Sequence, residues 1–231
     1  MKVPWLPKSG IEAIAGDVLS GYEMMTGAPV APPIPVEDVI ERYLNLRIGF
    51  MDFEQTYGFH DVLGAIYVKD RLIYADNTLL AGHSEGRLNF TFAHEAGHWV
   101  LHRKFVTDTE DSRAERTAIL CRKKDAKKPL EWQADYFAAC LLMPEKWIKS
   151  AFEKTVGIRP LHLHNTQRSL TGFVYIEPCV CNWPFIAQAI QKTGGFSNVS
   201  KQAIIIRLQE LGLVINETNA EIGWSRKQYA T

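Results

Sequence analysis

The sequence has no excess of charge of either sign, because 26 lysine and arginine residues are matched by 26 aspartate and glutamate residues. A neutral chain has no overall field that would draw it to nucleic acid or acidic lipid, so nucleic acid is an unlikely partner. The sequence also lacks an apolar run near the roughly 18 residues that span a bilayer, and the opening MKVPWLPKSG contains no apolar signal core. We therefore expect a cytoplasmic protein with no membrane partner.

Cysteine is scarce, with four residues in 231. This is too few for a disulfide framework, so we expect reduced thiols. Cys179 and Cys181 form a C-x-C pair, but no second pair follows at the spacing of a zinc finger. Hydrophobic residues make up 46% of the chain and charged residues 23%, which are values typical of a folded globular protein.

Hydrophobic periodicity predicts helices and short strands in the first third of the chain. Helical spacing covers residues 11–25 and 36–44. Runs rich in β-branched and aromatic residues cover 47–53, 63–68 and 71–75. We interpret these three runs as a small antiparallel sheet.

The rest of the chain is predicted to be mainly helical. Helices at residues 89–105 and 131–143 are separated by a polar and basic stretch, 113–128, which predicts a long loop. The later elements predicted are strands at 158–164 and 171–177 and helices at 182–195 and 199–214. The basic run within 113–128 is best explained as a solvated loop, and the helix at 199–214 as a packing helix rather than a DNA-recognition helix.

His94, Glu95 and His98 form an H-E-x-x-H motif inside the predicted helix 89–105. Residues four apart lie one turn apart on the same helix face, so both imidazoles can bind one ion. Glu95 lies on the same turn and is placed to take a proton from water, so we interpret it as a general base. Such a motif also occurs by chance on a helix, and the third ligand is therefore the deciding feature.

The metzincin spacing for a third ligand is absent. It requires histidine at position 104 and glycine at position 101, where the sequence has Lys104 and Leu101. His102 lies two turns from His94, about 12 Å along the helix, which is too far to share one ion. We interpret His102 as a surface residue or as a residue that supports a ligand.

Glu131 and Asp135 lie four apart on the apolar face of the predicted helix 131–143. An unpaired carboxylate in a core is costly, but metal binding by Glu131 and a hydrogen bond from Asp135 to a ligand histidine would satisfy both. Alternatively, Glu131 only favours the positive end of the helix and needs no metal. We assign Glu131 as the third ligand and Asp135 as its supporting residue.

The motif and the later segment EWQADYFAACLLMP together resemble the ImmA/IrrE family of bacterial metallo-endopeptidases. IPVEDVIERYLNLRI resembles the opening helix and strand of that family, LGAIYVKDRLIYAD its hairpin, and FSNVSKQAIIIRLQELGLV its closing helices, so the resemblance covers residues 30–215 approximately. It implies one zinc ion on His94, His98 and Glu131, with Glu95 as the catalytic base. Manganese or iron can use the same ligands.

We therefore expect an α+β fold, with a compact zincin-like metallopeptidase domain that has a small antiparallel sheet, two metal-bearing helices and a C-terminal helical region. Four segments are predicted: an N-terminal helix at 1–30, an ImmA/IrrE-type zinc peptidase core at 31–156, an atypical strand-like insertion at 157–182, and a C-terminal helical region at 183–231.

The resemblance implies limited proteolysis of a partner protein. The expected substrate is a helix-turn-helix transcriptional repressor of a phage-type, mobile-element or stress-response operon. An extended segment of it could add to an edge of the predicted hairpin, residues 63–68 and 71–75, by main-chain hydrogen bonds. The competing interpretation is a catalytically silent module that sequesters a repressor or antitoxin, or that contacts DNA.

Overall fold

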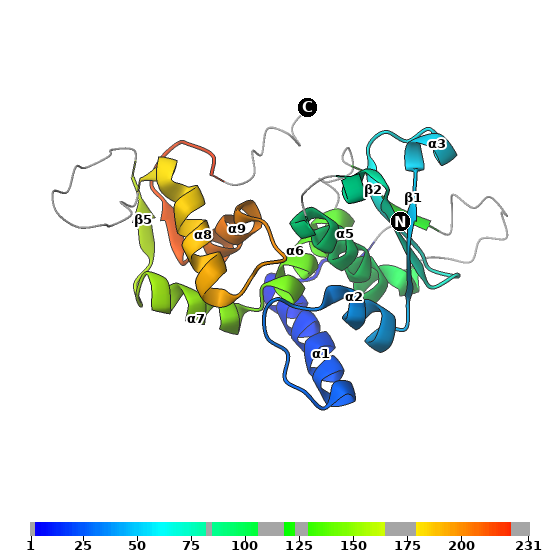
Figure 1. The fold of residues 1–231 in the computed structure, drawn as a ribbon, viewed down its shortest axis with the longest axis horizontal. Helices are drawn as coiled ribbons and strands as arrows, with labels where there is room; N and C mark the ends of the chain where they lie inside the picture. The colour runs from blue at the N-terminus through cyan, green and yellow to red at the C-terminus, as the bar shows by residue number, and fades with distance from the viewer. Residues whose placement is uncertain (1–2, 82–84, 106–117, 123–128, 165–178, 223–231) are drawn as a thin grey trace. The chain divides into compact units, whose positions relative to one another are not determined.

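The computed structural model describes residues 3–81, 85–105, 118–122, 129–164 and 179–222 (Figure 1). The chain divides into two units, Met1–Leu142 and Met143–Thr231. Helices and two small sheets make up the described part, which confirms the α+β class. The four predicted segments remain a prediction.

The helices of the first unit agree with the predicted ones, and short helices join them. They are α1 (Lys8–Thr26), α2 (Val36–Asp38) with the π-helical turn η1 (Val39–Tyr43), α3 (Phe53–Tyr57), α4 (Thr78–Ala81), α5 (Glu85–Gly97) with the π-helical turn η2 (His98–His102) and the 3₁₀ turn η3 (Arg103–Phe105), and α6 (Pro129–Leu142). Helix α6 packs against both α1 and α5. It is buried on most sides, and its second half, from Tyr136 to Leu142, contains no charged residue.

The first unit also contains a four-stranded sheet with the order β1-β3-β2-β4. Its strands are β1 (Arg47–Met51), β2 (Val62–Tyr67), β3 (Leu72–Asp76) and β4 (Ala118–Arg122). Strands β2 and β3 form the predicted antiparallel hairpin, but β1 is parallel to β3, so the sheet is mixed.

Strand β4 corrects the prediction of a continuous loop at 113–128. It pairs antiparallel with β2 and covers an edge whose backbone N–H and C=O groups would otherwise need other partners. Because β1 lies on the other side of the hairpin, both of the hairpin's edges are covered by the chain itself. This counts against the expected addition of a substrate to the hairpin.

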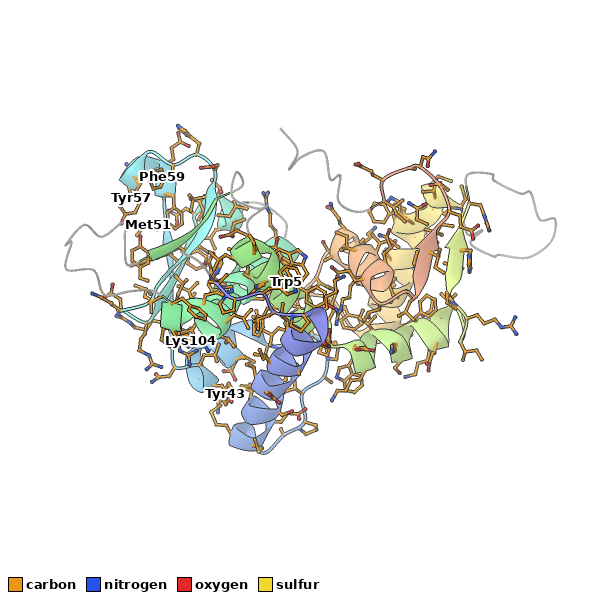
Figure 2. The ribbon with its side chains drawn as sticks, turned by 180° about the vertical axis from the view of Figure 1, so that it is seen from behind. Trp5, Tyr43, Met51, Tyr57, Phe59 and Lys104 are labelled. Atoms are coloured by element: carbon orange, nitrogen blue, oxygen red, sulfur yellow. The ribbon has the colours of Figure 1, made fainter. Side chains whose placement is uncertain are left out.

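The two faces of the sheet are covered differently. Helix α5 packs on the face of β2 and β3 to which Gly64 belongs. The alternation of side chains along β2 sends Ala65 and Tyr67 to the opposite face. There an apolar cluster forms around Phe53, and Figure 2 shows its outer members near α3, namely Met51, Tyr57 and Phe59. The sheet is therefore fixed from both sides next to α5.

The segment before α1 lies on α6. The ring of Trp5 stacks on that of Trp132, with centroids 4.8 Å apart and an interplanar angle of 9°, and Trp132 stacks in turn on Tyr136 (Figure 2 marks Trp5). The carbonyl oxygen of Pro4 accepts a hydrogen bond from the side-chain amide of Gln133 at 2.9 Å. These contacts tie the beginning of the chain to the helix that carries Glu131.

The second unit contains three helices and a short two-stranded parallel sheet in its described part. Its elements are α7 (Glu145–Thr155), β5 (Leu161–Leu163), the 3₁₀ turn η6 (Val180–Asn182), α8 (Trp183–Gly194), α9 (Lys201–Glu210) and β6 (Val214–Asn216). Helix α8 packs on α7 and on α9.

The second unit differs from the prediction at two places. The predicted helix 199–214 ends earlier, because Gly212 adopts a φ of 67° and the chain turns into β6. The predicted strand at 171–177 lies outside the described residues. Helix α9 buries Ile204, Ile205 and Leu208, which supports a packing role. Within the described ranges, no helix combines the length and the apolar character needed to cross a membrane.

Candidate metal centre

Helix α5 and the turn η2 that continues it place the H-E-x-x-H motif in the core of the first unit. His94 is 3% exposed, and Glu95 and His98 are fully buried. The π-helical turn begins at His98, and such turns are frequent at functional sites. The helical spacing brings the two imidazoles together as predicted, with Nε2 of His94 2.9 Å from Nε2 of His98.

Helix α6 adds Glu131 to this pair. Its Oε2 lies 3.2 Å from Nε2 of His94 and 3.6 Å from Nε2 of His98. Two ligands of a tetrahedral zinc ion, each about 2.1 Å from it, are about 3.4 Å apart, which matches these separations. In the part of the chain that the structure describes, these three residues are the one group of three or more potential ligands that converge.

A small residue lets the two helices approach closely enough for this convergence. A Cβ atom on Gly97 would lie 3.1 Å from the ring of Phe137 and 3.2 Å from backbone atoms of Ala134. Gly97 precedes His98, and Ala134 lies one turn after Glu131. The close crossing of α5 and α6 at Gly97 therefore sets the reach of Glu131 toward both histidines.

The buried atoms of the site fit a cation. One carboxylate oxygen of Glu131 and one ring nitrogen of each histidine lie within 4.8 Å of one another, and these are atoms of the kind that bind a zinc ion. Both carboxylate oxygens of Glu95 are buried, and neither has a hydrogen-bond partner among the described residues. A buried carboxylate needs a partner beyond the described residues, and water held beside a metal ion would be one.

Burial and neighbouring groups shift the pKa values of the site residues in the absence of a metal ion. Burial raises the pKa of Glu95 to about 8, and lowers that of His98 to about 4, which keeps its imidazole neutral. Burial also opposes ionisation of Glu131, but the adjacent His94 and His98 outweigh it and hold the pKa of this carboxyl well below its ordinary value. The site thus combines an anionic ligand with a carboxyl group that holds protons near neutral pH.

Asp135 lies behind the first histidine. Its Oδ1 is 2.8 Å from Nδ1 of His94. A carboxylate only accepts hydrogen bonds, so Nδ1 of His94 carries the proton and Nε2 is the nitrogen available to a metal. This is the arrangement expected for a supporting residue.

His102 lies behind the second histidine and is fully buried, so it is not a surface residue. Its Nδ1 is 3.0 Å from Nδ1 of His98, and its Nε2 is 3.1 Å from Oε1 of Gln133. No pattern in the sequence indicated a role for Gln133. The signal that could have pointed to this contact is the column of His94, His98 and His102, spaced four residues apart on one helix face.

The C-x-C pair belongs to the second unit. The sulfur atoms of Cys179 and Cys181 are 2.8 Å apart, with Cys179 buried and Cys181 exposed. Within the described ranges, neither joins a group of three potential metal ligands.

Comparison with known families adds an independent finding. The family model for the IrrE N-terminal-like domain of peptidase M78 matches residues 42–162, which is more than half of the 231 residues. The match is narrower than the predicted resemblance over 30–215, and it includes both helices of the candidate centre. The curated proteins contain no match to this chain. With its motif, its converging ligands and this match taken together, the chain belongs to the peptidase M78 family, the ImmA/IrrE type that its sequence resembles.

Proposed function

We propose that the protein is a zinc-dependent endopeptidase in which His94, His98 and Glu131 bind the metal and Glu95 is the catalytic base. The observation that carries this proposal is the carboxylate of Glu95, which is buried beside the three converging side chains and has no hydrogen-bond partner in the described residues. A core that only needed to pack would not place an acid there.

The bound cation would supply Lewis acidity, which polarises the scissile carbonyl and lowers the pKa of a nearby water molecule. Glu95 takes the proton of that water as it attacks the peptide carbon. Glu95 then delivers that proton to the departing amine. Asp135 keeps the proton of His94 on Nδ1 and so keeps Nε2 directed at the metal.

We further propose that the substrate is a cytoplasmic transcriptional repressor and that it binds as an extended segment. Support for the repressor is the family to which the chain belongs. For the binding mode, we propose β4 in place of the hairpin edge, because β4 has one strand partner among the described residues and adjoins β2, whose Gly64 faces Glu95. Main-chain hydrogen bonds to such an edge select a flexible segment over a folded one.

The decisive experiment compares wild-type protein with the Glu95→Gln variant on a helix-turn-helix repressor encoded beside the gene. Cleavage is followed by mass spectrometry and zinc by elemental analysis. We expect the variant to keep its zinc but to cleave about 10²- to 10⁴-fold more slowly, since only the base is lost. Glu85→Gln is the matched control, because Glu85 is exposed at the start of the same helix.

Two results would contradict the proposal. One is wild-type protein that binds no zinc under conditions in which it is folded. The other is a Glu95→Gln variant that retains both zinc and full regulation of the repressor's target gene, which would favour the binding module that only sequesters its partner.

A further inference from the structure

A chain of hydrogen bonds runs from the beginning of the polypeptide to the candidate metal centre. The carbonyl oxygen of Pro4 is 2.9 Å from Nε2 of Gln133, and Oε1 of Gln133 is 3.1 Å from Nε2 of His102. Nδ1 of His102 is 3.0 Å from Nδ1 of His98. Gln133, His102 and His98 are each fully buried, so water does not compete for the two contacts that His102 makes.

The chemistry of these groups fixes which group donates and which accepts in each of these hydrogen bonds. A backbone carbonyl only accepts, so Gln133 must present its NH₂ group to Pro4 and its oxygen to His102. That oxygen also only accepts, so Nε2 of His102 carries a proton. In a neutral ring the other nitrogen is then an acceptor, and Nδ1 of His102 takes a hydrogen bond from Nδ1 of His98. The proton of His98 is thereby placed on Nδ1, and Nε2 is left with a free lone pair.

We propose that His102 and Gln133 are positioning residues that fix the tautomer of His98, so that its unprotonated Nε2 faces Glu131 and the metal. The proposal rests on the proposed metal site. The tautomer of His98 would thus be fixed as Asp135 fixes that of His94, but by two neutral side chains in place of a carboxylate. Neither of the two touches the ion, and they act only through His98.

Loss of either group removes this control. Without an acceptor at position 133, the proton of His102 is free to move to Nδ1 and point at His98. The proton of His98 must then move to Nε2, where it occupies the lone pair that a metal requires. Second-layer changes of this kind cost about 10- to 100-fold in metal affinity.

The test uses two substitutions of His102 in the full chain, with zinc affinity measured by chelator competition. His102→Asn keeps an acceptor, since its Oδ1 can occupy the place of the ring Nδ1, whereas His102→Leu fills the buried space but offers no acceptor. We expect His102→Leu to bind zinc about 10- to 100-fold more weakly than wild type and His102→Asn to bind it more tightly than His102→Leu. A residue that only fills the core predicts the reverse order, because leucine packs better there than a smaller polar side chain. That reverse order would overturn the proposal.

A second measurement does not depend on a variant that folds. Long-range ¹H–¹⁵N correlation spectra of metal-free wild-type protein distinguish the two histidine tautomers. We expect the proton on Nδ1 of His98 and on Nε2 of His102. A proton on Nε2 of His98 would overturn the proposed role of His102 and Gln133. Neither readout requires proteolysis. Zinc binding without cleavage would therefore refute the proposed endopeptidase activity alone. A proton on Nε2 of His98 would refute the positioning role of His102 and Gln133 alone.

Discussion

Gly64 of β2 lies directly against Glu95 of α5: a Cβ atom at Gly64 would be 2.8 Å from Oε1 of Glu95 and 2.7 Å from Cγ2 of Thr91. Real Cβ atoms do not approach other atoms this closely. The strand therefore passes over the carboxylate of the proposed base with no side chain in between, and the position of that carboxylate depends on glycine at residue 64.

Substitution of Gly64 by alanine should impair catalysis and spare the metal. The methyl group would displace the Glu95 carboxylate, and a displacement of about 1 Å can cost roughly 100-fold in rate. Zinc content should stay at the wild-type level, because the ligands are not touched. The measurement is kcat/KM for cleavage together with elemental analysis. Gly16→Ala is the control, since a Cβ atom at Gly16 meets nothing within 4 Å, and equal rates for the two variants would contradict the argument.

Substitution of Gly97 by alanine should weaken metal binding, in contrast to the substitution of Gly64. The added methyl group would press on Ala134 and Phe137 and move α5 away from α6, which withdraws Glu131 from the two histidines. We expect overpacking to cost about 1–3 kcal/mol of stability and zinc affinity to fall by about tenfold or more. Thermal unfolding and chelator competition measure the two effects. Unchanged affinity in a destabilised variant would show that the helix crossing does not set the site.

Glu131→Gln should lose zinc with little change in shape. The amide keeps the volume of the side chain but removes the negative charge that a cation requires, so we expect affinity to fall by about 100-fold or more. Elemental analysis after dialysis gives the occupancy. Glu145→Gln, at the start of α7, provides a control for the same change elsewhere. Full occupancy in Glu131→Gln would mean that the third ligand has been assigned wrongly.

The stability of the metal-free protein should fall between pH 6.5 and pH 8. The pKa of Glu95 is raised from 4.5 to about 8, so the folded state holds a proton that the unfolded state releases, and stability declines as the pH rises toward 8. The pKa of His98 is lowered from 6.5 to about 4, which makes stability rise with pH, but only up to about pH 6.5. Above that pH, of these two groups only Glu95 still changes the stability. The free energy of unfolding should fall by about 2 kcal/mol between pH 6.5 and pH 8, at about 1.4 kcal/mol per pH unit.

Urea unfolding of metal-free protein at a series of pH values measures this decline. Glu95→Gln cannot ionise at this position and should show a flat profile over the same interval. An equal decline in the variant would assign the effect to another group.

The sequence was sufficient to locate the helices of the site because their signals are local. The spacing of His94 and His98 fixes both on one helix face, and the two acids of the later helix fall on its apolar side. The convergence of Glu131 with the histidines is a tertiary contact between distant parts of the sequence. It could be predicted because an acid on the apolar face of a helix needs a partner. The roles of ligand and base remain proposals.

Other features depended on contacts that periodicity does not encode. Strand direction is one of them, since the alternation in β1 is the same whether it pairs parallel or antiparallel to β3. Strand β4 is a short apolar run among charged residues, and its strand partner in the described part of the chain is the edge of β2. The role of Gln133 was hidden because its two partners, Pro4 and His102, lie far from it along the chain.

The stack of Trp5 on Trp132 gives the molecule a built-in optical reporter. Trp132 follows Glu131 directly, so loading the ion and shifting that carboxylate should change the overlap of the two indoles and with it their emission. We expect metal exchange to change this part of the emission of the six tryptophans, and a fluorescence titration with zinc measures it without a substrate or a dye.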